Sequence, residues 1–377
     1  MITKKTIISI GTDRNLFSPD STVVKRQLDY ASALNKEVKI IVFSLKKHNF
    51  QPKNIADNLT IYPTNSFGRL FYIWDAIIIA KSIAKDRKIV LVSAQDPFEA
   101  GLSALFVSKI LKCPLHIQIH TDLHSLYFRI NFLNRLRLFL SKLVISRAQH
   151  IRVVSNRIKE NLQTNFRSLP TVSVLPIYVN LRQLKNQKPN NYFRKKYQQF
   201  DFVILWAGRL EQEKNPLLAI RAMSLIASAQ LKVCLVMVGQ GRLAKKISQK
   251  IKLMDNVFLE PWQDNLPSCL KAVDAYLSTS WYEGYGLTIA EAAAVGCPII
   301  STDAGLAGSI LIDGQEALIC QPGDATCLAA KICSLVKNQK LRQRLTTEAR
   351  DKILCFSQTK EEFIKEYAKD INQASVR

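Results

Sequence analysis

The sequence predicts two doubly wound α/β domains, each a parallel sheet covered by helices. Its 377 residues are too many for one compact core and suit two domains of about 150 to 200 residues. Short apolar runs rich in β-branched residues alternate with helical patterns along the whole chain. The alternation comes as two successive series, one in each half, which is typical of two domains built from βαβ units.

The elements follow in order from these patterns. In the first half we expect buried strands at KKTIISIG (4–11), VKIIVFSL (38–45), KIVLVSA (88–94), PLHIQIH (114–120) and HIRVVS (150–155), with helices at 21–34, 71–85 and 98–111. In the second half we expect strands at FVILWAG (202–208), KVCLVMVG (232–239), AYLSTS (275–280), CPIIST (297–302) and ALICQPG (317–323), with helices at 215–228, 241–251, 287–295 and 325–337. The polar stretch 181–201 is the best linker candidate, so we predict domains at 1–188 and 189–356.

Composition narrows the class of protein. The chain is 47% hydrophobic and 22% charged, as in ordinary globular proteins. The apolar part of the N-terminus MITKKTIISIG is too short for a signal peptide, and no apolar run approaches the roughly 20 residues of a membrane span. Seven of the eight cysteines follow residue 200, and none forms a CxxC pair. We therefore expect reduced core cysteines in a cytosolic protein.

The net charge of +23 is concentrated in the first half. Residues 1–200 hold 32 of the 53 Lys and Arg but only 11 of the 30 Asp and Glu. Within 101–200, only Asp122 and Glu160 oppose 17 basic residues. The first half is therefore expected to meet an acidic partner, for which a membrane surface, a phosphorylated acceptor and nucleic acid all stay open.

Ligands of such sheets bind beyond the carboxyl ends of the strands, and three predicted strand ends in the second half carry suggestive residues. After FVILWAG come Arg209 and Lys214, a pair of cations that suits a diphosphate. The alternative is that Arg209 pairs with Glu211 or Glu213 at the surface. After LVMV come Gly239 and Gly241, which either let a ligand approach the backbone or form a plain turn.

The third strand end lies in AYLSTSWYEGYGLTIAEA. Gly284 and Gly286 precede a helix expected from about Leu287, and a helix N-terminus favours phosphate. Glu283 stands before this anion site and Glu291 one helical turn inside it. A nucleotide sugar has that layout, with vicinal hydroxyls on either side of a diphosphate. The alternative is that Glu283 caps the helix and Glu291 pairs with a lysine.

Together these residues resemble the retaining glycosyltransferases of family 4, which have the GT-B fold. EGYGLTIAE (283–291) is similar to the family's E-x7-E motif, AGRLEQEKN (207–215) to its GRLxxxKN segment, VGQGRL (238–243) to its VGxGxL turn and DGQEALICQPGD (313–324) to its DGxxGxLxxPGD segment. In the first half, IQIHTD (117–122) and RVVSNRIKENL (152–162) resemble the family's His-bearing strand end and following helix. The resemblance implies two Rossmann-like domains facing across a cleft, with a last helix at 357–377 that crosses back to the first domain.

The resemblance also implies roles for residues. Glu291 should bind the donor ribose, Glu283 the transferred sugar, and Arg209 and Lys214 the diphosphate, while His120 should face the transferred sugar across the cleft. The implied donor-binding residues are Gly208, Arg209, Lys214, Gly239, Gly241, Trp262, Glu283, Gly284, Tyr285, Gly286, Leu287 and Glu291.

We expect no cofactor and no metal. Two cations and a helix N-terminus can neutralise a departing diphosphate, and the sequence has no Asp-x-Asp motif. His116, His120 and His124 recur every four residues, but a strand at 114–120 leaves His124 in the next loop. We therefore interpret His116 as an ordinary, partly buried residue.

Three departures from the family pattern limit what can be carried over. Ser21–Thr22 stand where the family has adjacent glycines, and Gly308–Ser309 where it has a glutamate. Glu260 replaces a common glycine ahead of Trp262, so the choice between UDP and GDP stays open.

The sequence thus predicts a retaining glycosyltransferase that moves a sugar from a nucleotide-diphosphate sugar to an acceptor glycan or lipid-linked sugar. A GT-B-fold sugar-nucleotide epimerase and a basic nucleic-acid-binding protein are the alternatives, and no nucleic-acid-binding motif supports the latter. Residues 125–149 carry five basic residues, no acid and many Leu and Phe. This segment predicts peripheral binding to an anionic membrane from the cytoplasm, or else an ordinary core helix.

Overall fold

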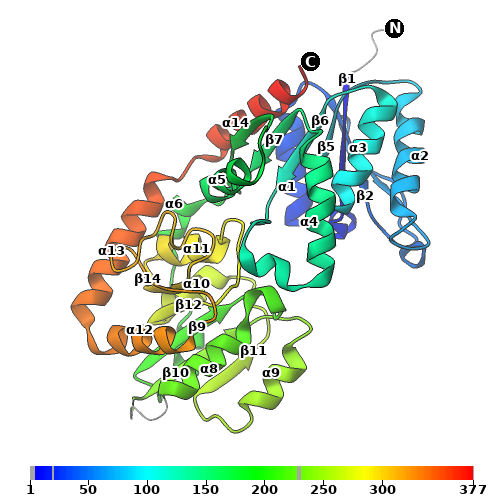
Figure 1. The fold of residues 1–377 in the computed structure, drawn as a ribbon. Helices are drawn as coiled ribbons and strands as arrows, with labels where there is room; N and C mark the ends of the chain where they lie inside the picture. Colours follow the sequence, from blue (N-terminus) through cyan, green and yellow to red (C-terminus); the bar gives the residue numbers. More distant parts are fainter. Residues whose placement is uncertain (1–4, 19–20, 227–230, 377) are drawn as a thin grey trace. The chain divides into compact units, whose positions relative to one another are not determined.

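A computed structural model describes residues 5–18, 21–226 and 231–376. The chain forms two compact units (Figure 1). Unit 1 contains Met1–Pro176 together with Thr359–Arg377, and unit 2 contains Ile177–Gln358. Each unit has its own mostly or wholly parallel sheet, which confirms the predicted α/β class.

The sheet of unit 1 has eight strands in the order β3-β4-β2-β1-β5-β6-β7-β8. Neighbouring strands are parallel except at the edge, where β3 runs antiparallel to β4. The strands are β1 (Lys5–Gly11), β2 (Glu37–Val42), β3 (Lys53–Ala56), β4 (Leu59–Pro63), β5 (Lys88–Ala94), β6 (Leu115–Ile119), β7 (His150–Val153) and β8 (Thr171–Val174).

The helices of unit 1 include the last helix of the chain. They are α1 (Thr22–Ser32), α2 (Tyr72–Ala84), α3 (Glu99–Leu111), α4 (Phe132–Ile145), α5 (Asn156–Asn165) and α14 (Lys360–Ala374), with short 3-10 helices η1 (Arg14–Phe17), η2 (Lys46–His48) and η3 (Leu126–Ile130). Helix α14 begins at a capping box formed by Thr359 and Glu362. It packs against α1, where the ring of Tyr367 stacks on that of Tyr30 with centroids 4.2 Å apart.

The sheet of unit 2 has six parallel strands in the order β11-β10-β9-β12-β13-β14. The first three strands of the unit run outward to one side and the last three to the other, as in a dinucleotide-binding fold. The strands are β9 (Phe202–Ala207), β10 (Val233–Val238), β11 (Val257–Glu260), β12 (Ala275–Ser278), β13 (Ile299–Thr302) and β14 (Leu318–Cys320). Every residue of β9 and β10 is buried, which explains their unbroken apolar sequences.

Helices cover this sheet. The four that the sequence predicts are present and begin within three residues of their predicted starts, whereas the others were not predicted. The helices of unit 2 are α6 (Leu181–Leu184), α7 (Asn191–Lys195), α8 (Pro216–Ile226), α9 (Ala244–Ile251), α10 (Leu266–Ala272), α11 (Leu287–Val295), α12 (Ala325–Lys337) and α13 (Gln339–Cys355), with a 3-10 helix η4 (Gln212–Lys214). Helix α11 starts at Leu287, as predicted. Residues 227 and 228, predicted to be helical, and the predicted helical residue 377 lie outside the described residues.

The boundary between the units lies after Pro176 and not at 188/189. The polar stretch predicted as a linker forms α6 and α7, which pack on α11 and α10 of unit 2. Leu181 and Phe193 are buried there, and the backbone N–H of Asn190 donates to the carbonyl of Ser268 at 2.9 Å. The chain returns to unit 1 at Thr359, close to the predicted residue 357.

The prediction that all cysteines are reduced is wrong for two of them. Cys320, at the end of β14, is bonded to Cys327, in the first turn of α12. The turn between them brings their Cα atoms to 5.9 Å, because Asp324 caps α12 by accepting from the N–H of Cys327.

The basic segment 125–149 forms two helices and not one. Asn131 has an extended backbone and caps α4 by accepting from the N–H of Leu133 at 3.0 Å, which separates η3 from α4. This break explains the uneven helical spacing of the apolar residues in the sequence. Among the described residues, no helix is both long and apolar enough to cross a membrane.

Candidate active site

The three predicted strand ends of unit 2 meet at one edge of its sheet. β9 lies between β10 and β12, and all three run in the same direction. Their carboxyl ends therefore bring together the loop of Arg209 and Lys214, the turn of Gly239 and Gly241, and the loop that leads to α11. The strand order reverses between β9 and β12, which is the place where ligands bind in such sheets.

The loops after β9 and β12 are bonded to each other. The indole N–H of Trp206 donates to the Thr279 hydroxyl at 2.9 Å, and this hydroxyl lies 3.0 Å from the carbonyls of both Lys214 and Asn215. The backbone N–H of Trp281 donates to the carbonyl of Glu213 at 2.8 Å. These bonds hold the Lys214 backbone in a fixed position next to the second loop. No local sequence signal marks Trp206 or Thr279, because their roles depend on contacts between strands.

Lys214 and Glu283 form an ion pair at this edge. Lys214 Nζ lies 2.5 Å from Glu283 Oε1, and Ser280 Oγ donates to the same oxygen at 2.7 Å. Both side chains are partly buried, so their positions are restricted. Arg209 pairs with Glu213, which is the surface alternative considered above, and its side chain is 72% exposed. A free face of the Arg209 guanidinium thus remains open to an anionic ligand.

Gly239 and Gly241 serve packing between loops. A Cβ on Gly239 would lie 1.9 Å from the carbonyl oxygen of Gly208, and one on Gly241 would lie 2.5 Å from that of Leu210. The two loops are also hydrogen-bonded, since the N–H of Leu210 donates to the carbonyl of Gln240 at 2.8 Å. Glycine is therefore required at both positions by the close approach of the chain's own backbone, which fits the alternative of a turn.

The N-terminus of α11 and Glu291 form the second part of the edge. Gly286 caps α11 with φ of 90°, without a side-chain hydrogen bond, and the first turn holds no acid. Glu291 is on the second turn, and among the residues that the structure describes its carboxylate has no hydrogen-bonding partner, so the lysine pairing considered above is absent there. Burial raises the pKa of Glu291 to about 7. A partly buried carboxylate without a partner among the described residues indicates a place for a polar ligand.

Gly305, which the sequence analysis did not select, shapes this edge too. It has φ of 62°, and a Cβ there would lie 2.5 Å from the carbonyl oxygen of Tyr285 and 2.9 Å from Cβ of Glu283. The N–H of Leu306 donates to the same Tyr285 carbonyl at 2.9 Å. Burial raises the pKa of the Tyr285 phenol. The loop after β13 therefore packs against the loop that carries Glu283 and restricts its position.

Trp262 lies beyond the end of β11, on the far side of β10, and is about half exposed. Glu260, which replaces a common family glycine, accepts bonds from Lys196 Nζ and from the Tyr197 hydroxyl, both at 2.6 Å. The Glu260 carboxylate is therefore already bonded to two residues of unit 2.

His120 belongs to unit 1 and directly follows β6. Its burial, together with the positive charges of Arg152 and Arg26, lowers its pKa to about 3, so its ring is neutral near pH 7. Asp122, two residues on, accepts two bonds from the Asn161 amide at 3.0 and 3.1 Å. The IQIHTD strand end is thereby tied to α5, the helix that resembles the second family segment in this half.

The interpretation of His116 as partly buried and ordinary is wrong. His116, His150 and Asp370 are all buried, and one ligand atom from each lies within 4.8 Å of the others. His150 Nε2 lies 2.7 Å from Asp370 Oδ1, to which the Ser173 hydroxyl also donates, while His116 Nδ1 lies 2.9 Å from Ser93 Oγ. Burial alone would raise the pKa of Asp370, but these donors outweigh it and lower the pKa. The group fastens α14 to β6, β7 and β8.

Two family models match almost the whole chain. The model described as Glycosyltransferase Family 4 matches residues 21–183, and the model described as Glycosyl transferases group 1 matches residues 188–352. The first match contains His120, and the second contains Arg209, Lys214, Glu283 and Glu291. The residues selected from the sequence therefore fall within the matched regions.

Individual proteins agree with the family models. The poly(glycerol-phosphate) alpha-glucosyltransferase of Bacillus subtilis is 32% identical over 146 residues, which are 38% of this chain but only 22% of that protein. The capsular polysaccharide biosynthesis glycosyltransferase CapM of Staphylococcus aureus is 22% identical over 349 residues, 88% of each chain. The structure of HepE from Anabaena, in complex with UDP and glucose, has a TM-score of 0.73 at 17% identity and covers 98% of this chain and 99% of its own. Motifs, fold and family matches agree, and the chain belongs to the family 4 type of glycosyltransferases with the GT-B fold.

Proposed function

We propose that this glycosyltransferase takes its sugar from a nucleotide-diphosphate sugar, retains the configuration at the anomeric carbon and needs no metal ion. The observation that carries the proposal is the edge of unit 2, where a Lys214–Glu283 pair, a helix N-terminus and Glu291 follow one another, the last without a hydrogen-bonding partner among the described residues. HepE, of similar fold, was solved with UDP and glucose, which supports a donor of this class.

The arrangement suits each part of such a donor. The ammonium of Lys214, the exposed guanidinium of Arg209 and the first amides of α11 can hold the diphosphate and stabilise the charge that develops on the departing nucleotide. Glu283, fixed by Lys214 and Ser280, is proposed to accept hydrogen bonds from hydroxyls of the transferred sugar. Glu291 is proposed to bind the ribose. His120 is proposed to contact the transferred sugar on the strength of the family resemblance alone.

The proposed acceptor is a glycan or a lipid-linked sugar in polysaccharide assembly. CapM acts in capsular polysaccharide biosynthesis by its name, and poly(glycerol-phosphate) is named as the acceptor type of the Bacillus relative. The basic first half of the chain suits an acceptor that is anionic or presented at an anionic membrane, with the protein at its cytoplasmic face. The family matches favour sugar transfer over the epimerase and nucleic-acid-binding alternatives.

Separate roles for the two glutamates can be tested by nucleotide binding. Loss of a charged hydrogen bond to ribose in Glu291→Gln should weaken binding of the bare nucleotide diphosphate about 10- to 100-fold. Glu283→Gln should leave bare-nucleotide affinity within about threefold but lower turnover, because a sugar contact is absent from that ligand. Isothermal titration with UDP and with GDP gives both affinities and identifies the base. Equal weakening by the two substitutions would contradict these roles.

The same titrations carry a pH test. Ribose hydroxyls donate to an ionised carboxylate, and the Glu291 carboxyl has a pKa raised to about 7 in the free protein. Binding should therefore strengthen as the pH rises through about 7, as Glu291 loses its proton. Glu291→Gln, titrated with the same nucleotide over the same pH range, should lack the part of the pH dependence that comes from Glu291. Any pH dependence that remains in this variant comes from ionisation of the nucleotide or of other groups.

We expect donor turnover to be independent of divalent metal ions. Two cations and a helix N-terminus provide the charge that a metal would supply, and the sequence has no Asp-x-Asp motif. Initial rates measured with excess EDTA should equal those with Mg²⁺ or Mn²⁺. Activity that EDTA abolishes and Mn²⁺ restores would rule out this part of the proposal.

A further inference from the structure

Exposed large hydrophobic side chains are concentrated on one part of unit 1. Among the residues that the structure describes, 14 of the 21 such side chains lie between Phe67 and Leu143, on α2, α3, η3, α4 and the loops that flank them. Single exposed hydrophobic residues are normal on a protein surface, but a concentration of them indicates a binding surface.

Helix α2 presents apolar residues to solvent as well as to the core. Tyr72, Ala76, Ala80 and Ile83 are buried against unit 1. On the other side, Leu70, Trp74 and Ile78 recur every four residues and are 87, 68 and 65% exposed. Exposed Lys81 and Lys85 continue the same face of the helix. The sequence pattern alone does not separate such an outer face from a core face.

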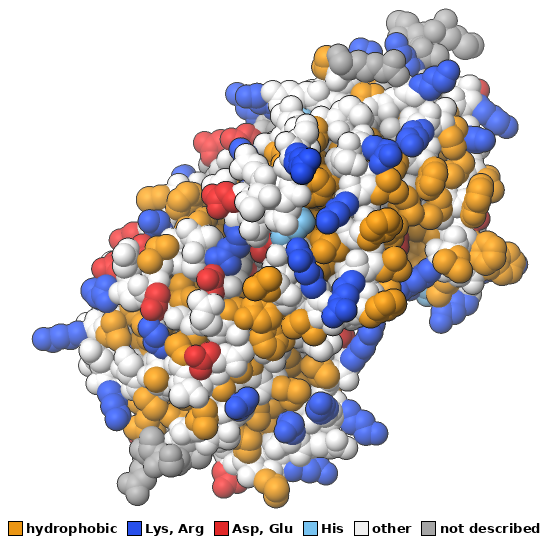
Figure 2. Space-filling view, viewed as in Figure 1, with side chains coloured by type: hydrophobic (Ala, Val, Ile, Leu, Met, Phe, Trp, Pro, Cys, Tyr) orange, Lys and Arg blue, Asp and Glu red, His pale blue; other side chains and the backbone are white. Residues whose placement is uncertain are grey.

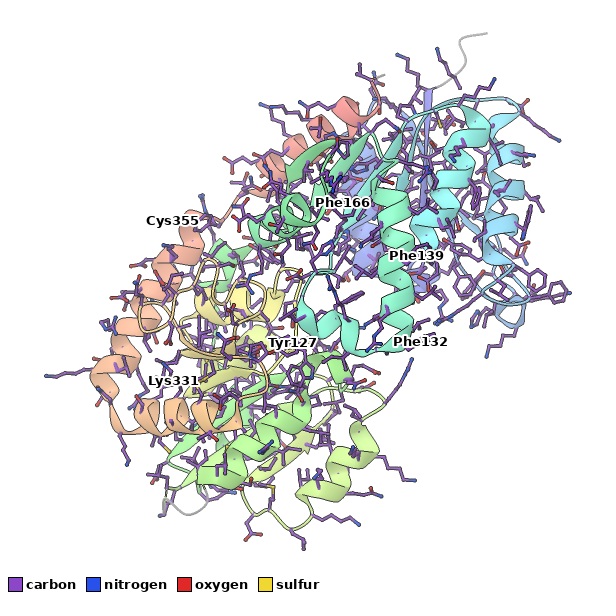
Figure 3. All side chains as sticks on the ribbon, viewed as in Figure 1. Tyr127, Phe132, Phe139, Phe166, Lys331 and Cys355 are labelled. Atoms are coloured by element: carbon purple, nitrogen blue, oxygen red, sulfur yellow. A yellow bond between two sulfur atoms is a disulfide. The ribbon has the colours of Figure 1, made fainter. Side chains whose placement is uncertain are left out.

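Helix α4 carries a second outer stripe in which apolar and basic residues alternate. Phe132, Leu136, Phe139 and Leu143 are exposed at helical spacing, and exposed Arg135, Lys142 and Arg147 lie on the same side. Figure 3 labels Phe132 at the start of α4 and Phe139 further along it. Arg137 points elsewhere, because it pairs with Glu99 of α3 at 2.9 Å.

Helix α3 joins the two stripes. It packs against both α2 and α4, and its own exposed residues include Phe106, Lys109 and Ile110. We call the outer faces of α2, α3, η3 and α4, with the loop from Phe67, the α2–α4 surface. Figure 2 shows hydrophobic side chains over this part of unit 1, with Lys and Arg among them.

The charge of the α2–α4 surface indicates what covers it. Residues 66–149 contain 12 Lys and Arg but only five acids, of which Glu99 is bound to Arg137 and Asp122 is buried. A second copy of the chain would bring one basic surface against another. An anionic bilayer attracts the bases and accepts Trp, Phe and Leu side chains at its interface.

We propose that the α2–α4 surface is a membrane-docking surface whose hydrophobic side chains, those of Trp74 and Phe139 foremost, enter the interface of an anionic bilayer. This deepens the proposed function, since it says which surface brings the protein to a membrane-borne acceptor. The sequence analysis expected membrane binding only through residues 125–149, whereas this proposal adds insertion of side chains from α2. Neither step needs the donor, so docking can be measured separately from sugar transfer.

Co-sedimentation of the full chain with vesicles tests the proposal. The wild type should bind vesicles of phosphatidylcholine with 30% phosphatidylglycerol and not those of phosphatidylcholine alone, with binding that falls as salt is added. Trp74→Ala/Phe139→Ala should lower the partition coefficient at least about tenfold. Arg135→Glu/Lys142→Glu should lower it at least about as much, since each basic residue contributes about fivefold near an anionic surface.

Matched variants in unit 2 serve as controls. Leu253→Ala changes an exposed leucine that has lysines nearby, and Lys245→Glu/Lys246→Glu reverses two exposed charges on α9. Both should bind vesicles like the wild type, and so should Glu283→Ala, even if it cannot transfer sugar. Thermal shifts with UDP should confirm that Trp74→Ala/Phe139→Ala keeps a folded donor site.

Acyl-chain bromination gives a direct readout of insertion. Brominated lipids in the anionic vesicles should quench tryptophan fluorescence of the wild type, and Trp74→Phe should remove that quenching. No binding to anionic vesicles, equal binding to neutral ones, or an equal loss in the unit 2 controls would overturn the proposal. A dimer in light scattering that Trp74→Ala/Phe139→Ala abolishes, without vesicle binding, would instead identify a second copy as the occupant.

Discussion

Lys214→Ala should lower the turnover number at least about 100-fold, since it removes a cation from the place where leaving-group charge is proposed to develop. The substitution also leaves Glu283 without its ion-pair partner. Arg209→Ala should lower turnover by a similar factor for the same reason. Single-turnover rates with saturating donor separate this loss from weaker binding.

The proposed diphosphate role predicts a clear contrast with a nearby arginine. Arg242 pairs with Glu211 at the same edge of the sheet, but its side chain is 89% exposed and belongs to the turn after β10. Arg242→Ala should therefore keep nearly full turnover, while Lys214→Arg should recover part of the loss because it restores the charge. Turnover of Lys214→Ala within about threefold of the wild type would contradict the role of this lysine.

Asp370→Asn should destabilise unit 1 by at least about 3 kcal/mol, because it removes a buried charge that its surroundings are built to hold. His150, Ser173 and the nearby His116 ring face this carboxylate, and its charge also acts on the buried Arg152, whose pKa burial lowers. Arg152 itself donates to the carbonyls of Leu175 and Pro176 and to the Gln118 amide oxygen.

Hydrogen exchange measures this effect locally, which is necessary because a chain of two units does not unfold in one step. Peptides from β6, β7 and β8 should exchange faster in Asp370→Asn, whereas those of unit 2 should be unchanged. Glu348→Gln, which removes an exposed pair with Arg344, is the control and should cost less than about 0.5 kcal/mol. Since the pKa of Asp370 is lowered below its ordinary value of 3.8, its contribution is present above that pH and declines as the pH falls below it.

Local patterns of the sequence predicted the start of α11 and the long buried strands, because such strands and a helix that follows glycine leave clear local signals. The strands β3, β4, β8 and β11 were not predicted. They placed Lys214, Glu283 and Glu291 at strand ends that the structure brings together. They did not show that Gly239 and Gly241 pack against Gly208 and Leu210, since that depends on which strands are neighbours.

Long-range contacts account for most of the errors. The stretch 181–201 looked like a linker because it is polar, yet buried Leu181 and Phe193 attach it to unit 2. The bond between Cys320 and Cys327 depends on the geometry of one turn. The exposed face of α2 has no local signal, because Trp74 and Ile78 have the spacing of any amphipathic helix. In each case the structure depends on which distant residues a segment contacts, and a local sequence pattern does not contain that information.

The contact between His150 and Asp370 spans 220 positions of sequence, and this has a consequence for the order of events during synthesis. Unit 2 is continuous from Ile177 to Gln358, so all of its segments are synthesised before α14. Helix α14 can pack on unit 1 only after the final residues leave the ribosome. Until then Arg152, His116 and His150 lack Asp370, and the core of unit 1 is incomplete. The N-terminal half of the chain is thus the last to mature, and a premature stop before Asp370 would leave it open to aggregation and proteolysis.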